Sequence, residues 1–250
     1  MTFTNQSELS RPDQKEELSY IYEDPKQAGV RLNLSSQYTI ANYLRFADEV
    51  KAYIGSGRVL DWGCGHGQVS WLLGRRELEV VSYDLADKRL ERFIQPHVLF
   101  QRAPNKCDLP FSNASFDGVL SCGVLEHVPN ERLSLSELHR ILKPVGYLFV
   151  YQLPQVYAYT EFINRMRGLW YHQRRYTLRS ATALFKETGF EIVTHRRSNL
   201  FPKNLTGLPA HMRNAYNRVS RYLLAAEDVM VKIPGVSWLC HSFEFVVRKS

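Results

Sequence analysis

Three glycines at alternate positions, Gly63, Gly65 and Gly67, separate an apolar segment that contains Asp61 from an amphipathic segment that begins at Gln68. Glycine lets the backbone turn sharply, and it exposes main-chain N–H groups that any Cβ would shield from a ligand. The spacing is GxGxG, whereas a dinucleotide site needs GxGxxG to seat a pyrophosphate at the start of a helix. The glycines therefore predict a ligand-binding turn that is not a dinucleotide fingerprint, and an ordinary tight turn is the alternative.

A carboxylate, Asp84, ends the next apolar segment of the chain. It follows the glycines at roughly the 20-residue distance at which a carboxylate accepts hydrogen bonds from ribose hydroxyls in folds of this kind. Capping of a helix that starts near Ala86 is the alternative role. The glycine turn and the carboxylate together predict a cofactor that contains ribose.

Residues that could carry a reaction lie further along the chain. His127 follows a strand-like segment, and an imidazole that is neutral near pH 7 could take a proton from a hydroxyl acceptor. Capping or packing at a helix end is the alternative role for His127. A later segment is rich in tyrosine and basic residues that could meet an anionic or polyhydroxylated acceptor, unless they form a solvated basic loop. The candidates for acceptor binding are Tyr157, His172, Arg174 and Arg175.

The elements that position these residues alternate between strands and helices. Strands are expected at 58–63, 78–84, 98–101, 116–121, 146–153, 190–195 and 242–248, and helices at 40–54, 68–75, 86–93, 131–142 and 178–188. Such alternation implies a parallel sheet that is covered on both faces, with ligands bound at the carboxyl ends of its strands. We therefore expect an α/β fold: a Rossmann-like, doubly wound, seven-stranded and mostly parallel sheet with helices on both faces.

Two regions lie outside this alternation. Residues 1–36 show no sustained periodicity and are expected to form an N-terminal arm before a domain that covers 37–250. An insertion at 199–237 carries apolar residues at alternating gaps of four and three, which predicts an amphipathic helix near 209–233. Packing over the active-site end of the sheet and contact with a membrane surface are the two interpretations of this helix.

The composition limits the partners and the compartment. The chain has 32 Lys and Arg against 25 Asp and Glu, a net charge of +7, which favours an acidic substrate, an anionic membrane or nucleic acid. No RNA-binding module is present, so nucleic acid is disfavoured. The four cysteines have no CxxC spacing, which argues against a zinc site and against a disulfide framework. We expect a cytoplasmic protein, because the sequence has neither a signal-like start nor a membrane-spanning apolar run.

Four features of the chain together resemble the class I S-adenosylmethionine-dependent methyltransferases. They are the motif Asp61-x-Gly63-x-Gly65-x-Gly67, Asp84, the segment DLPFSNASFD at 108–117 and the segment VLEHV at 124–128. The resemblance is closest to the quinone, sugar and lipid branch, and it covers about 59–154, with weaker likeness through 193. It implies S-adenosylmethionine as cofactor and a lid at about 154–177. The usual LKPGG turn of the family appears here as LKPVG, with Val145 in place of the first glycine.

The resemblance also assigns cofactor contacts. The methionine end would lie against Asp61, Gly63, Cys64, Gly65 and Gly67, the ribose on Asp84, the adenine against Leu85, Asn105 and Lys106, and the methyl group near Ser121 and Cys122. Asn105 occupies a position where the family often has Asp, but its carbonyl oxygen can still accept from the adenine amine. Metal-dependent relatives carry an acidic residue three positions before the Glu-His pair, and this chain has Gly123 there, so no metal is expected.

These observations predict a methyltransferase that acts on a small or medium-sized acceptor by O-methylation of a hydroxyl. The alternatives are a catalytically inactive S-adenosylmethionine-binding protein that acts through partners, and a methyltransferase of a lipid-linked or nucleic-acid acceptor. An oxidoreductase is disfavoured by the glycine spacing. The acceptor and the oligomeric state stay open at this point.

Overall fold

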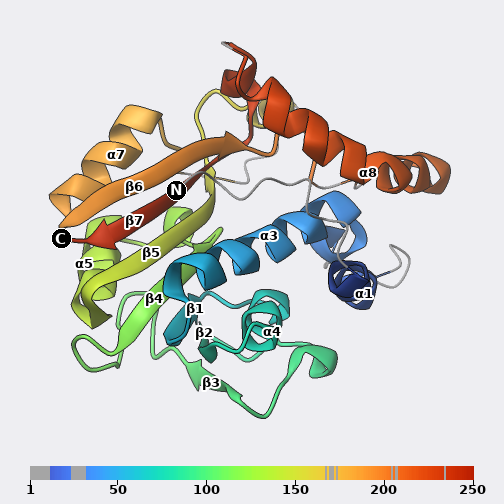
Figure 1. The fold of residues 1–250 in the computed structure, drawn as a ribbon. Coiled ribbons are helices and arrows are strands. Elements are labelled where there is room, and N and C mark those ends of the chain that lie inside the picture. The colour runs from blue at the N-terminus through green and yellow to red at the C-terminus, as the bar shows by residue number, and fades with distance from the viewer. Residues whose placement is uncertain are drawn as a thin grey trace.

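A seven-stranded sheet forms the centre of the protein in the computed structural model, which describes residues 12–23, 32–166, 168, 172, 174–203, 205, 208–233 and 235–250. The strands are β1 (Arg58–Trp62), β2 (Glu79–Asp84), β3 (Val98–Arg102), β4 (Phe116–Cys122), β5 (Leu142–Pro154), β6 (Phe190–Ser198) and β7 (Ser242–Lys249). Their order is β3-β2-β1-β4-β5-β7-β6 (Figure 1). β7 runs antiparallel to β5 and β6, while the other pairs are parallel. The expected seven-stranded, mostly parallel sheet is confirmed.

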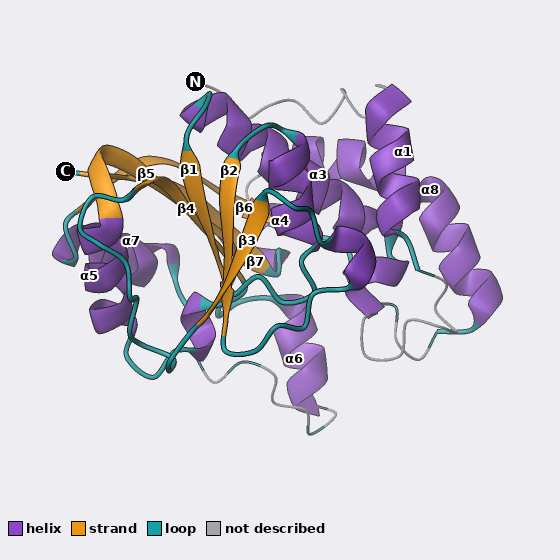
Figure 2. Cartoon of the chain, turned by 90° about the horizontal axis from the view of Figure 1, so that it is seen from below, coloured by secondary structure: helices purple, strands orange, loops and turns teal. Residues whose placement is uncertain are grey.

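Helices cover both faces of this sheet (Figure 2). The α-helices are α1 (Pro12–Ile21), α3 (Gln37–Ile54), α4 (Gln68–Arg75), α5 (Glu131–Ile141), α6 (Tyr159–Met166), α7 (Leu178–Glu187) and α8 (Ala210–Met230). Short 3₁₀ helices are η2 (Leu32–Ser35), η3 (Glu91–Phe93), η4 (Leu125–His127) and η5 (Val236–Leu239). α3 and α4 lie on one face of the sheet, and α5 and α7 lie on the other.

The period of two along each strand divides the core into two layers. Val59 packs in the cluster that holds α3 and α4, whereas the next residue, Leu60, packs in the cluster that holds α5 and α7. Val119 and Leu120 of β4 divide in the same way. Successive side chains of a strand point to opposite faces, so continuous apolar runs are what a sheet buried on both faces requires.

The expected helix at 86–93 is wrong, because the structure has only the single turn η3 there. Arg89 turns back on Asp87 through its main-chain N–H and its guanidinium, at 2.9 to 3.1 Å. The main-chain N–H of Leu90 donates to the carbonyl of His66 at 3.0 Å. These bonds hold the segment against the glycine turn in an extended path that a helix could not follow.

Part of the expected N-terminal arm is a packed helix. α1 buries Ile21 and holds α4 through Glu17, which pairs with Arg75 and Arg76 at 3.1 and 3.2 Å. Tyr20 also stacks on Trp71 of α4 with 4.8 Å between ring centres, so aromatic and polar contacts together attach this helix. The remaining arm residues 1–11 and 24–31 lie outside the described residues.

α8 lies against the first turns of α3. Asn217 accepts a hydrogen bond from the main-chain N–H of Gln37 at 3.1 Å, and Leu224 packs with Tyr38 and Ala41. Glu227 accepts from the main-chain N–H groups of residues 199 and 200. The last turn of α3 leads through a short turn into the start of β1, so the first turns of α3 lie toward the carboxyl ends of the strands. Because α8 packs on these first turns, it also lies at that end of the sheet. Among the described residues, no helix has the length and apolar character to cross a bilayer.

Val145, which stands at the position of the family's first glycine, lies near the start of β5 and has a strained backbone. Val145 has φ 58° and is 66% exposed. A β-branched residue rarely adopts this left-handed conformation, because its Cβ crowds the backbone. The pairing of β5 with β4 shifts register at this point and is regular beyond it, from Tyr147 opposite Gly118 to Tyr151 opposite Cys122.

Candidate active site

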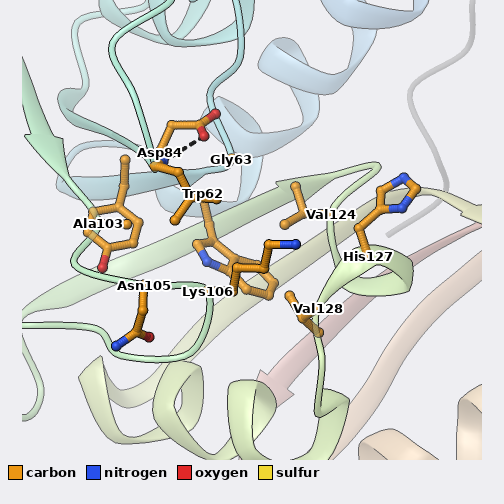
Figure 3. A pocket seen from close by; sticks show the side chains of 11 residues that line it. Trp62, Gly63, Asp84, Ala103, Asn105, Lys106, Val124, His127 and Val128 are labelled. Atoms are coloured by element: carbon orange, nitrogen blue, oxygen red, sulfur yellow. Dashed lines mark hydrogen bonds between the residues drawn. The ribbon is translucent and has the colours of Figure 1, made fainter.

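A pocket lies at the carboxyl ends of β1, β2 and β4 (Figure 3). Its lining is formed by Trp62, Gly63, Tyr83, Asp84, Leu85, Ala103, Asn105, Lys106, Val124, His127 and Val128. Six of the residues that the sequence singles out therefore border one cavity. Asp61, Cys64, Gly65, Gly67, Ser121 and Cys122 do not line it and lie beside or beneath it.

Asp84 fixes the glycine turn at the edge of this pocket. One carboxylate oxygen accepts from the main-chain N–H of Gly65 at 3.0 Å, and the other accepts from that of Leu85 at 2.7 Å. A carboxylate has about four acceptor positions, so it can also receive ribose hydroxyls. No α-helix follows Asp84, and the helix-cap alternative therefore loses its basis.

Two glycines of the turn are required for different reasons. A Cβ on Gly63 would lie 2.3 Å from Cγ2 of Val124, so this position is closed by the protein itself. A Cβ on Gly65 would meet nothing within 4 Å, although the residue has φ 52°. The space beside Gly65 is thus open, and the backbone of this residue is accessible to a ligand.

Asp61 supports the turn from below. It is 2% exposed, and its carboxylate accepts from the hydroxyl of Ser70 at 2.5 Å, which joins the end of β1 to α4. Burial raises the pKa of Asp61 to about 6, and the bond from Ser70 opposes this rise. Cys64 is also buried, and burial raises the pKa of its thiol.

Leu85 and Tyr83 border the part of the pocket where adenine is expected; Leu85 is 41% exposed, whereas the ring of Tyr83 is buried. The Asn105 carbonyl accepts from the main-chain N–H groups of Cys107 and Asp108 at 2.8 and 2.9 Å. Its amide donates to the Asp108 carboxylate at 2.7 Å. Asn105 therefore closes its own turn, and its carbonyl oxygen is already engaged.

Buried polar atoms collect where β4 ends. Within the described part of the chain, Oγ of Ser121 and Oε2 of Glu126 have no hydrogen-bond partner, and Glu126 is 6% exposed. Burial raises the pKa of Glu126 to about 7. Unpaired buried polar atoms are costly in a folded protein and require an explanation, such as a ligand that completes them.

Three histidines meet beside Glu126. The ring centre of His172 is 5.8 Å from that of His127 and 5.6 Å from that of His241. Nδ1 of His172 lies 2.8 Å from a carboxylate oxygen of the buried Glu161. His127 is more than half exposed, and burial, then His172 and Lys106, lower its pKa, which favours the neutral form.

The same side chains form two groups with metal-ligand character. Glu126, His127 and His172 place their ligand atoms within 4.8 Å of one another, and so do Glu161, His172 and His241. Two His and one Glu are a ligand set that zinc accepts. The expectation that this protein binds no metal therefore remains a prediction.

The basic residues of the lid lie in different surroundings. Arg174 donates to the carbonyl of Val128 at 2.8 Å and pairs with Glu131 at 3.1 Å, so its guanidinium ties the lid to the loop after β4. Arg175 is half-buried, and Tyr157 is 59% exposed and stacks on Trp238 with 6.0 Å between ring centres. Lid residues 167, 169–171 and 173 lie outside the described residues.

Some polar residues at this end are absent from the sequence-based candidates. Gln152 has φ 61° at a register shift of β5, and its side-chain oxygen accepts from Nζ of Lys203 at 3.3 Å. Burial lowers the pKa of Lys203. Glu161 and His241 were missed as well, because nothing in their local sequence marks them and they meet His172 only through the fold.

The chain resembles known methyltransferases. Residues 60–150 match the family model "Methyltransferase domain". An uncharacterized methyltransferase of Mycobacterium bovis is 31% identical over 138 residues, which cover 48% of this chain and 68% of the relative. A ubiquinone biosynthesis O-methyltransferase of Paracidovorax citrulli is 35% identical over 103 residues, 37% of this chain and 42% of that protein. The chain thus matches less than half the length of the latter relative.

A solved structure has the same fold. The S-adenosylmethionine-dependent methyltransferase of Archaeoglobus fulgidus aligns with a TM-score of 0.57 at 16% identity, over 83% of this chain and 93% of that one. At this identity the likeness concerns the fold. Sequence, strand order and glycine turn agree, and the chain belongs to the class I S-adenosylmethionine-dependent methyltransferase family.

Proposed function

We propose that this protein transfers the methyl group of S-adenosylmethionine to a hydroxyl of a small or medium-sized acceptor. The observation that carries the proposal is one pocket with Asp84 at its ribose side and His127 at its other rim. O-methylation is supported by the Paracidovorax citrulli relative, whose name states that activity. A small molecule is favoured over nucleic acid, because no RNA-binding module accompanies the fold.

In this proposal the chain works by holding and shielding its reactants. Bound S-adenosylmethionine supplies a methyl group on a sulfonium. Asp84 would accept the ribose hydroxyls, Leu85 would pack on the adenine, and the backbone of the turn at Gly65 would hold the methionine end. The acceptor hydroxyl lies between the end of β4 and the lid, where His127 takes its proton. Alignment of the two reactants inside a dry pocket supplies most of the acceleration.

A catalytically inactive cofactor-binding protein is the main alternative, since catalysis by positioning requires no particular residue. Calorimetry comes first: S-adenosylmethionine and S-adenosylhomocysteine should bind the chain, whereas a nicotinamide dinucleotide should not. Transfer of labelled methyl to a panel of hydroxylated acceptors, with amine-bearing analogues as controls, then tests the reaction. Binding without transfer to any acceptor would favour the inactive protein, and preference for the dinucleotide would contradict the cofactor assignment.

Peripheral membrane contact through the helix near 209–233 is also part of the proposal. It is supported by Met212, Val219 and Tyr222 of α8, which are 44% to 59% exposed although large and apolar. Contact of this kind would suit an acceptor that resides in or near a bilayer. It is not needed for methyl transfer itself.

A further inference from the structure

Large apolar side chains are concentrated on two exposed segments, 156–166 and 208–239. Those that are at least 48% exposed are Tyr157, Phe162, Met166, Tyr222, Val229, Ile233, Trp238 and Leu239. α6 carries two of these residues and stands out from the body of the protein (Figure 2). Large exposed apolar groups scattered singly are ordinary, but their concentration on two segments indicates a binding surface.

The two segments meet in space. The ring of Tyr157 stacks on that of Trp238, and the side-chain amide of Gln155 donates to the main-chain carbonyl of Trp238 at 3.0 Å. Ile233 closely precedes η5, which contains Trp238. Through these contacts the segment that leads into α6 adjoins η5, which follows α8. We call the exposed side chains of α8, η5 and segment 156–166 together the apolar band.

The distribution of polar and apolar side chains around α8 is unusual for a surface helix. Its buried side chains include the polar Asn217, Ser220 and Glu227, while Tyr222 and Val229 are turned outward. An amphipathic surface helix normally turns its apolar stripe to the core. Leu224 packs on Tyr38 and Ala41 beside these polar groups, so apolar and polar contacts together attach α8 to α3. The outward face of the helix nevertheless carries the exposed Tyr222 and Val229.

In the same two segments the negative side chains face the protein and two positive side chains face the solvent. All three of their carboxylates face inward: Glu161 contacts His172, Glu227 accepts from main-chain N–H groups, and Asp228 pairs with Arg196 at 3.6 Å. Arg218 and Lys232 are exposed. The outer surface of the apolar band thus combines apolar side chains, aromatic rings and positive charge.

We propose that the apolar band binds the surface of a bilayer that contains anionic phospholipid. The apolar and aromatic side chains enter the interface, and Arg218 and Lys232 lie among the headgroup phosphates. A second copy of the chain is the competing occupant. Two cationic faces would repel each other across a symmetric interface, whereas an anionic bilayer complements both the charge and the apolar groups. This surface extends the proposed membrane contact beyond α8, and its test does not depend on methyl transfer.

The test is co-sedimentation of the full chain with vesicles of phosphatidylcholine, with and without phosphatidylglycerol. Binding should be strong only with phosphatidylglycerol and should weaken as salt is added. Arg218→Gln with Lys232→Gln should lower the partition coefficient by about 30-fold, since each cation near an anionic surface contributes about fivefold. Arg179→Gln with Lys186→Gln, two exposed cations of α7, is the matched control and should change binding little.

The apolar part has its own pair of variants. Val229→Ser should lower binding by up to about tenfold, because a buried Val side chain contributes on the order of 1.5 kcal/mol. Leu99→Ser, at an exposed residue of β3, should leave binding unchanged. Absence of binding to either vesicle, or equal losses in the control variants, would overturn the proposal. A dimer by light scattering that Val229→Ser dissociates, without vesicle binding, would assign the surface to a second copy instead.

Discussion

The two sides of the active site are built in different ways. The proposed cofactor side comes from the part of the chain between Trp62 and Lys106, at the ends of the neighbouring parallel strands β1, β2 and β3, and it includes the backbone of the glycine turn. The proposed acceptor side joins Glu126, His127, His172 and His241 from separate elements and relies on side chains. A backbone turn suits a cofactor that stays the same across a family, whereas side chains on a lid and an insertion can change with the acceptor. Variants on the two sides should therefore fail in different steps.

The largest expected effect is on the acceptor side, at His127. A positioned base contributes about 10²–10⁴ in rate, so His127→Ala should lower kcat by about that factor while cofactor affinity stays unchanged. His127→Gln should restore little, because an amide does not take up the proton. In the wild type, kcat should rise with pH and level off above the lowered pKa of His127, as the imidazole becomes neutral.

Two further variants sharpen this test. His97→Ala, at an exposed histidine away from the pocket, is the control and should retain full activity. His172→Gln tests the other imidazole, which is oriented by Glu161. If His127→Ala keeps its turnover per folded molecule while His172→Gln loses it, the base is His172 and His127 only lines the pocket.

Asp84 should give the next largest effect, and on binding alone. Asp84→Ala should weaken the cofactor by about 2 to 4 kcal/mol, since each charge-assisted hydrogen bond contributes about 1.5 to 3 kcal/mol and water replaces part of the loss. Titration calorimetry measures this, with thermal unfolding to show that the turn near Gly65 survives. Unchanged affinity in a folded variant would mean that the carboxylate serves the turn and not the ribose.

Substitutions in the glycine turn should distinguish an effect on stability from an effect on cofactor binding. Gly63→Ala should reduce the free energy of unfolding by about 1 to 3 kcal/mol, because its Cβ would collide with Val124. Gly65→Ala should cost only about 1 kcal/mol of stability, from its positive φ, and yet abolish cofactor binding. Denaturant titration and calorimetry on both variants give the comparison. Tight cofactor binding by Gly65→Ala would show that the open space beside this residue is not the cofactor site.

The smallest expected effect is at Arg174. Arg174→Ala removes the bond to Val128 that ties the lid, so KM for the acceptor should rise about fivefold, the equivalent of one net hydrogen bond near 1 kcal/mol. Cofactor affinity should stay the same. A large fall in kcat would instead indicate that the guanidinium contacts the acceptor directly, as the sequence alone suggests. Steady-state kinetics with one transferable acceptor distinguishes the two outcomes.

The sequence predicts the fold around the proposed cofactor side well, because the signals for its strands and turn are local. Strand periodicity, alternate glycines and Asp84 all lie within a few dozen residues, and each has a definite place in a βαβ unit. The helix expected at 86–93 fails, since Leu90 bonds to His66 across the turn. Glu161 and His241 could not be predicted, because only the fold brings them to His172. The sequence also does not reveal that the guanidinium of Arg174 already donates hydrogen bonds to main-chain carbonyls.

Val145 has a practical consequence for anyone who produces this protein. A β-branched residue held in the left-handed region stores about 1 to 3 kcal/mol of strain. Val145 is exposed and lies near the start of β5, opposite the strand ends that border the pocket. Val145→Asn relieves much of that strain without the added freedom that glycine gives the unfolded chain. The substitution should therefore raise the melting temperature by a few degrees, on the order of 2 to 4 °C per kcal/mol for a chain of this size. The more stable Val145→Asn protein could then carry the other substitutions, so that variants with weak binding can be purified and measured.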